Sequence, residues 1–277
     1  MAAIDAHQHF WKYDPVNYGW INDDMSGIKK DFLPNDLKPV LEKNEFDGCV
    51  LVQAEQTKEH TDFLIQLATE NDFIKGIVGW VDLQAGDIEQ QIEFYKEQEK
   101  IKGFRHILQD EPDRALMLKP EFKKGIEVLS KNDFTYDILI HNDQLRFTSS
   151  LVSEFPYQLF VIDHIAKPDI RNKKITDWEK SIRTIAEYDN VYCKISGMMT
   201  ENDWKEWKKE DFTPYIEIVL DAFGIKRLMF GSDWPVCLLA ASYEETLAIV
   251  KDYFSPFSKD EQEMMFGGNA QQFYNLN

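Results

Sequence analysis

The sequence predicts an α/β protein, a single-domain (β/α)8 TIM barrel, and three observations carry this prediction. Short apolar runs alternate with amphipathic stretches along all 277 residues. The apolar runs are continuous, which is typical of parallel strands that helices cover on both faces. There are eight such runs, and eight strand-then-helix units in a chain of this length favour a closed barrel over an open sheet.

The elements follow one another regularly along the chain. The predicted strands cover residues 3–9, 48–53, 74–81, 103–108, 135–140, 159–164, 191–195 and 227–231. Helical patterns cover residues 35–43, 58–71, 88–100, 120–131, 142–154, 176–188, 214–223, 243–254 and 259–274. No repeat or Gly/Ser/Pro-rich linker divides the chain, so we expect one domain over residues 1–277.

Residues 12–34 form a long, aromatic-rich segment after the first predicted strand, and they include Tyr13, Tyr18 and Trp20. Long loops in compact domains are usually functional. Because the active site of a barrel lies at the carboxyl ends of its strands, we expect this loop to lie over that face.

Composition limits the partners. A net charge of −18 argues against nucleic acid and against an anionic membrane surface. The cysteines, Cys49, Cys193 and Cys237, are scattered and suit a reducing compartment. No secretory signal or long apolar window is visible, so we expect a cytoplasmic protein that acts on a small molecule. The sequence leaves open whether the protein forms a homodimer.

Polar residues gather at the predicted strand ends. His7 and His9 end the first strand, and residues two apart on a strand share a face. Imidazole binds metals and transfers protons near neutral pH. A chance His-x-His in a flexible terminus is the alternative. Every histidine except His60 falls at or near a strand end, and the further polar residues there are Gln53, Glu55, Arg105, His106, His141, Asp163, His164, Lys194, Ser196, Ser232 and Asp233.

Four of these residues suggest the chemistry. His7, His9, His164 and Asp233 could form a mixed nitrogen and oxygen set for one Zn²⁺ or a similar cation. Such a metal would polarise a carbonyl and lower the pKa of water. Without it, Asp233 could act as general base while the imidazoles polarise the substrate. Either route points to hydrolysis. Alternatively, Asp233 is a turn residue and His164 a structural histidine.

Other residues suit substrate binding. The Arg105 guanidinium could hold a sugar oxygen or a developing oxyanion, or else form a structural ion pair. We also assign His141 and Gln53 to substrate binding. Trp11 and Trp234 adjoin the site motifs and could offer flat apolar surface to a sugar ring, although tryptophans in barrels more often belong to the core.

Several motifs together resemble the lactonase branch of the amidohydrolase superfamily. They are DAHQHFW at 5–11, GFRH at 103–106, DH with KP within 163–168, KISG at 194–197, FGSDWP at 230–235 and GNA at 268–270. The resemblance implies a barrel in which Asp233 activates water beside His7, His9 and His164. It further implies a carboxylic-ester hydrolase of carbohydrate metabolism that opens a sugar lactone, such as L-fuconolactone or L-rhamnonolactone, to the sugar acid.

The resemblance also limits the cofactor. Many superfamily members carry a carboxylated lysine at the end of strand 4, whereas residues 103–107 offer no suitable lysine. We therefore expect no bridged two-metal centre, and either one divalent metal or none. Two catalytic alternatives remain, a metal-dependent nonoxidative decarboxylase and a pyrone-dicarboxylate lactonase. The second would need several arginines in the pocket to bind a dicarboxylate, and only Arg105 clearly lies at a predicted strand end. A silent binding barrel is a third alternative, and the complete His/His/His/Asp set argues against it.

Overall fold

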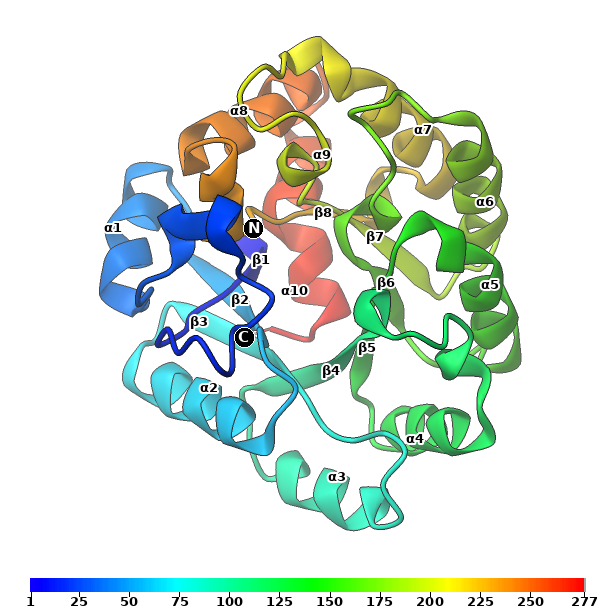
Figure 1. Cartoon of the computed structure of the whole chain (residues 1–277). Coiled ribbons are helices and arrows are strands. Elements are labelled where there is room, and N and C mark those ends of the chain that lie inside the picture. Colours follow the sequence, from blue (N-terminus) through cyan, green and yellow to red (C-terminus); the bar gives the residue numbers. More distant parts are fainter. Residues whose placement is uncertain (277) are drawn as a thin grey trace.

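The computed structural model describes residues 1–276 and confirms the predicted barrel. Within those residues, one parallel sheet of eight strands runs in sequence order from β1 to β8, and helices surround it (Figure 1). The strands are β1 Ile4–Gln8, β2 Gly48–Val52, β3 Ile74–Gly79, β4 Ile101–Ile107, β5 Thr135–Leu139, β6 Phe160–Ile162, β7 Val191–Ile195 and β8 Leu228–Phe230. The helices are α1 Pro34–Lys43, α2 Lys58–Glu70, α3 Ile88–Lys96, α4 Pro120–Lys131, α5 Leu145–Glu154, α6 Thr176–Ala186, α7 Thr213–Phe223, α8 Tyr243–Phe254, α9 Lys259–Glu263 and α10 Asn269–Phe273.

The first and last strands meet through the segment that follows β8. The backbone N–H of Asp233 donates to the carbonyl of His7 at 2.8 Å, and the N–H of His9 donates to the carbonyl of Trp234 at 2.7 Å. These bonds bring the two ends of the sheet together. They also place the strand-1 histidines beside Asp233, although more than 220 residues separate them in sequence.

The elements follow from local sequence. Every residue of β2 is buried, as expected of a strand between the barrel interior and a helix layer. In α6, the buried Trp178, Ile182 and Ile185 recur at helical spacing, so one face of the helix packs inward. At the start of α8, the Ser242 hydroxyl accepts from the Glu245 N–H, and the Glu245 carboxylate accepts from the Ser242 N–H, which satisfies two terminal donors.

The helix predicted over residues 259–274 is interrupted. A π-helical turn, Met264–Gly268, separates α9 from α10. A Cβ atom at Gly267 would lie 2.0 Å from the Ala2 carbonyl oxygen, so this turn packs directly against the chain that leads into β1. The side chains of α10 and of Tyr274 then join a cluster with barrel residues such as Val50 and Val161. Helix α10 therefore closes the amino-terminal end of the barrel (Figure 1).

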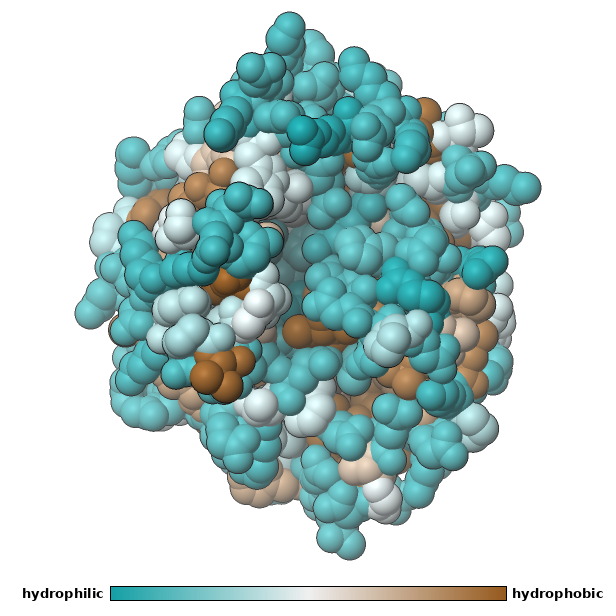
Figure 2. Space-filling model, viewed as in Figure 1, coloured by the Kyte–Doolittle hydropathy of each residue, from teal (hydrophilic) through white to brown (hydrophobic). Residues whose placement is uncertain are grey.

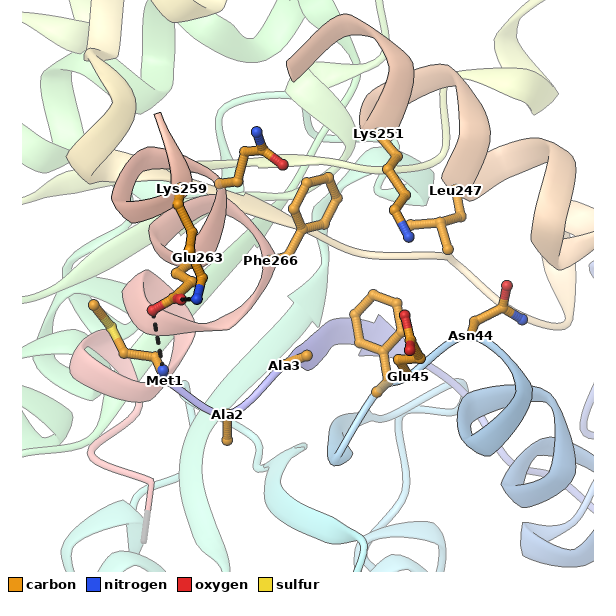
Figure 3. A pocket seen from close by; sticks show the side chains of 12 residues that line it. Met1, Ala2, Ala3, Asn44, Glu45, Leu247, Lys251, Lys259, Glu263 and Phe266 are labelled. Carbon is orange, nitrogen blue, oxygen red and sulfur yellow. Dashed lines mark hydrogen bonds and ion pairs between the residues drawn. The ribbon is translucent and has the colours of Figure 1, made fainter. Parts of the chain in front are cut away.

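Cavities lie at both ends of the barrel. One, of about 250 Å³, opens on the face that carries the carboxyl ends of the strands, and Figure 2 shows this face hollowed near its centre. Another, of about 260 Å³, lies at the opposite end (Figure 3), where the Met1 amine pairs with Glu263 at 3.2 Å. Among residues 1–276, the lining of this second cavity includes none of the predicted site residues. No helix in the same part of the chain is long and apolar enough to cross a membrane.

Candidate active site

The cavity at the carboxyl ends of the strands brings together four of the predicted site residues. Its lining includes His9, Arg105, His164 and Asp233. Trp20 and Met25 of the first βα loop also line it, as does Ala54 after β2. The aromatic loop therefore forms part of the cavity wall. Lining residues that we had not assigned to the site are Ile107, Gln109, Asp110, Leu139, Lys167 and Val236.

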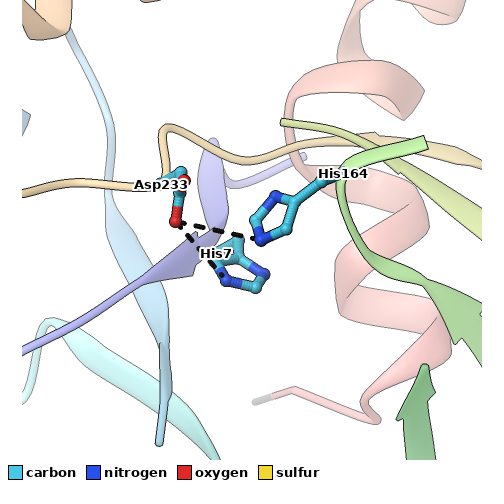
Figure 4. A group of neighbouring side chains, drawn as sticks. All are labelled: His7, His164 and Asp233. Carbon is cyan, nitrogen blue, oxygen red and sulfur yellow. Dashed lines mark ion pairs between the residues drawn. The ribbon is translucent and has the colours of Figure 1, made fainter. Parts of the chain in front are cut away.

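Three imidazoles converge on one carboxylate oxygen at the floor of this cavity. Asp233 Oδ1 lies 3.3 Å from His9 Nε2, 3.8 Å from His7 Nε2 and 3.9 Å from His164 Nε2. His7, His164 and Asp233 each offer one ligand atom, and these atoms lie within 4.8 Å of one another (Figure 4). All four side chains are buried.

An unusual backbone presents two of these groups. Residues 164–167 all have positive φ, and Asp233 has a φ of 57°. Non-glycine residues rarely adopt this left-handed region, and where they do so they cluster at functional sites. Gly197 makes room for the first turn, because a Cβ there would lie 2.5 Å from His164 Nδ1. The backbone is thus bent to aim His164 and Asp233 at the cavity.

Burial and neighbouring charge set the protonation states. Burial lowers the pKa of His164 to about 4 and that of His7 well below its ordinary value, so both rings are neutral near pH 7. Burial alone would raise the pKa of Asp233, but His164, His9 and His7 lower it below its ordinary value. The site therefore holds an ionised carboxylate beside the neutral rings of His7 and His164.

A set of buried ion pairs, here called the ionic column, lies directly beneath these four side chains. Arg105 NH1 donates to Asp163 Oδ2 at 2.9 Å, and Lys194 Nζ donates to Asp137 Oδ2 at 2.5 Å. Burial would raise the pKa of Asp163, yet Lys194, His7 and Arg105 hold it well below its ordinary value. The hydroxyl of Tyr274, which follows α10, donates to Asp137 at 2.8 Å.

Asp137 and Tyr274 were not among the residues predicted from the sequence. Asp163 and Lys194 were noted at strand ends, but no role was assigned to them. A single carboxylate inside the apolar run 135–140 was a signal for Asp137.

The remaining predicted substrate-binding residues lie outside the cavity lining in residues 1–276. Gln53 is buried and donates to the Arg105 carbonyl at 3.1 Å. Trp11 is buried and donates to the Lys30 carbonyl at 2.9 Å, and Trp234 packs edge-on against Phe32. His141 is exposed to solvent after β5. Their contact with substrate stays a prediction.

The donor set is suited to one divalent cation. His9 Nδ1 lies 2.8 Å from the Val52 carbonyl oxygen, which can only accept, so Nδ1 donates there and Nε2 faces Asp233 at 3.3 Å. Anchoring one ring nitrogen of a histidine on a carbonyl is typical of histidine ligands. Imidazole nitrogens with a carboxylate match the preferences of Zn²⁺ and similar ions, so His7, His164 and Asp233 could hold one, with His9 beside them.

Comparison with known proteins agrees with this geometry. The sequence model of a family described as Amidohydrolase matches residues 4–276. An L-fucono-1,5-lactonase of Burkholderia multivorans is 37% identical over 284 residues, which cover 99% of this chain and 96% of the relative. An L-fucono-1,5-lactonase of Burkholderia ambifaria is 34% identical, with 99% and 95% covered. The crystal structure of a Burkholderia multivorans amidohydrolase with bound zinc superposes with a TM-score of 0.97 at 36% identity, covering both chains completely. The barrel, its site and these matches agree, and the chain belongs to the amidohydrolase family.

Proposed function

We propose that this protein hydrolyses a neutral aldonolactone, such as L-fucono-1,5-lactone or L-rhamnonolactone, to its sugar acid. The observation that carries the proposal is the convergence of three imidazoles on Asp233 at the floor of a cavity about 250 Å³ in volume. The two L-fucono-1,5-lactonases at 37% and 34% identity support the lactone as the substrate class.

In the proposed reaction, Asp233 takes a proton from a water molecule as the oxygen of that water attacks the lactone carbonyl carbon. A base must be deprotonated to act, and the surrounding imidazoles hold Asp233 ionised. The imidazoles polarise the carbonyl, and Arg105 stabilises the negative charge that develops on its oxygen. The bond from the carbonyl carbon to the ring oxygen then breaks, and the ring oxygen takes up the proton that Asp233 received from the water, which makes it a hydroxyl and returns Asp233 to its ionised form.

A divalent cation held by His7, His164 and Asp233 would supply Lewis-acid polarisation of a carbonyl. The roles of Arg105 and of the aromatic wall do not depend on that ion. Arg105 is bound to Asp163 below, so its position is fixed before the substrate arrives. Preorganised charge of this kind costs no rearrangement during the reaction.

The charges at the cavity favour an uncharged substrate. Asp163 neutralises Arg105, and Lys167 lies 3.8 Å from Glu201. The lining itself contributes the carboxylates of Asp110 and Asp233. A dicarboxylated lactone would meet these two carboxylates with little unpaired positive charge to offset them.

The test measures kcat/KM on a panel of sugar lactones. For the best substrate, Asp233→Asn keeps the shape of the side chain but removes the base, and kcat/KM should fall by about 10²–10⁴-fold. Asp113→Asn, at an exposed ion pair with Lys119, is the matched control and should leave the rate unchanged.

Chelation should cost less than the Asp233→Asn substitution. Near-normal activity of Asp233→Asn, or a preference for a dicarboxylated pyrone lactone, would contradict the proposal. Activity abolished by chelator and restored by Zn²⁺ would instead show that the metal is required.

A further inference from the structure

The short turn that follows β4, Leu108–Asp110, carries a side-chain amide that the proposed reaction does not use. Gln109 of this turn lines the cavity at the carboxyl ends of the strands. Its Oε1 atom is buried and has no hydrogen-bond partner among residues 1–276. Exchanging the amide oxygen and nitrogen would bury a donor at the same place. In either orientation, one buried polar atom of Gln109 therefore lacks the partner that such atoms normally have.

Hydrogen bonds from neighbouring segments fix the backbone of this turn. The Gln144 side chain donates to the Leu108 carbonyl at 2.8 Å, and Arg114 donates to the Gln109 carbonyl at 2.6 Å. Arg114 is itself held by two hydrogen bonds to the Asp143 carboxylate, at 2.9 and 2.7 Å. The main chain of Gln109 is thus anchored, while its amide oxygen has no partner in the described part of the chain. This arrangement is expected of a group that is preorganised to bind a ligand.

The cavity around Gln109 offers both apolar and polar surface. Trp20 and Met25 contribute apolar surface from the loop after β1, whereas Gln109 and Asp110 contribute polar groups from the turn after β4. Because the strands follow one another in order around the barrel (Figure 1), these two segments approach the cavity from different sides. A sugar ring has apolar C–H groups and hydroxyls, so it matches both kinds of surface. A hydroxyl can donate to an amide oxygen or accept from an amide nitrogen, so it suits either orientation of Gln109.

We propose that Gln109 is a specificity-determining residue, whose amide hydrogen-bonds a ring hydroxyl of the substrate and so selects hydroxylated lactones over lactones without hydroxyls. This inference rests on the proposed function and adds the group that recognises the hydroxyls. The amide is neutral, so it binds a hydroxyl without adding charge to the cavity, in agreement with an uncharged substrate.

The test measures binding rather than turnover, and it uses lactams because an amide bond in the ring resists hydrolysis. The probes are L-fucono-1,5-lactam, which carries ring hydroxyls, and δ-valerolactam, which carries none. Gln109→Met keeps the length of the side chain and removes its amide. The Kd of L-fucono-1,5-lactam, measured by ligand-observed NMR, should rise by about 10-fold, the scale of one lost hydrogen bond. The Kd of δ-valerolactam should stay unchanged, and Gln90→Met, at an exposed position in α3, should change neither value.

Thermal unfolding separates a role in binding from a role in the fold. Because the Gln109 amide oxygen has no partner within residues 1–276, Gln109→Met should leave Tm unchanged or raise it. The matched comparison is Gln144→Met, which removes the hydrogen bond to the Leu108 carbonyl and should lower Tm. A lower Tm for Gln109→Met, or its failure to fold, would show that the amide supports the fold and would overturn the proposal.

The binding data can also overturn the proposal, and they can do so separately from the proposed function. Equal affinity of Gln109→Met and wild type for L-fucono-1,5-lactam would contradict it, including no binding by either, and so would an equal loss of affinity for δ-valerolactam. If lactones are hydrolysed while the lactam affinities are equal, the proposed function stands and the role of Gln109 is wrong. If the lactam binds through Gln109 but no lactone is hydrolysed, the role of Gln109 stands and the proposed function is wrong.

Discussion

At the scale of single residues, burial determines what Asp233 and its neighbours can do. An exposed histidine titrates near neutral pH, whereas desolvation lowers the pKa of the buried His164 to about 4. The pKa of Asp233 is also lowered, because the imidazoles around it favour its charged form. Both groups therefore keep the protonation states that the proposed reaction needs throughout the neutral range.

This predicts the pH dependence of the metal-free enzyme. The pKa of His164 is lowered from 6.5 to about 4, so protonation becomes appreciable only as the pH approaches that value. The profile of kcat/KM, which reports the free enzyme, should be flat from about pH 6 to 8 and fall as the pH approaches the His164 pKa. Initial rates measured in chelator-treated protein between pH 4 and 8 would check this. A loss centred between pH 6 and 7 would show that a histidine with an ordinary pKa controls the reaction.

At the scale of elements, the first βα loop forms one wall of the cavity. Trp11 and Phe32 exchange backbone hydrogen bonds at 2.9 Å, which ties the two ends of the loop together. Trp11 also packs against Tyr18 and Trp20 within the loop. The aromatic residues thus hold the loop over the barrel, and Trp20 reaches the cavity from this support.

Trp20 should therefore contribute to substrate binding more than to chemistry. Trp20→Ala removes an apolar wall without touching Asp233 or the imidazoles, so KM should rise by about 10-fold, or about 1.4 kcal/mol, with little change in kcat. Steady-state kinetics on the best lactone provide the measurement. Val16→Ala, at an exposed position in the same loop, is the control. A fall in kcat with unchanged KM would place Trp20 in the chemical step instead.

The sequence predicted the elements, and it singled out four residues that lie together in the structure, because both predictions depend on local patterns. Apolar runs mark the strands, and polar residues at their carboxyl ends share one face of the barrel, which brought His164 and Asp233 into the prediction. The ionic column was not predictable in this way, because Lys194 and Asp137 pair across the barrel interior at 57 positions apart. The break at Gly267 likewise depends on a close approach to Ala2, a contact between the two ends of the chain.

At the scale of the whole molecule, one column of polar contacts runs through the barrel from end to end. It begins at Tyr274 beneath the sheet and continues through Asp137 and Lys194 to His7 at the cavity floor. At the amino-terminal end of the barrel, Val50, Val161 and other apolar side chains pack against α10 and Tyr274. The carboxyl-terminal segment therefore both closes the barrel and donates a hydrogen bond to a buried carboxylate.

Removing the hydroxyl at the base of this column should lower stability. Tyr274→Phe keeps the ring but takes one donor from Asp137, whose Oδ1 already makes no hydrogen bond within residues 1–276. Leaving a buried acceptor short of a partner costs about 1–3 kcal/mol, and each 1 kcal/mol lowers Tm by about 2–4 °C in a domain of comparable size. Thermal unfolding of metal-free protein would measure the change, with Tyr157→Phe at a side chain that is 93% exposed as the control. Equal Tm values for Tyr274→Phe and wild type would show that Lys194 alone compensates Asp137, and that the carboxyl-terminal segment closes the barrel through apolar packing.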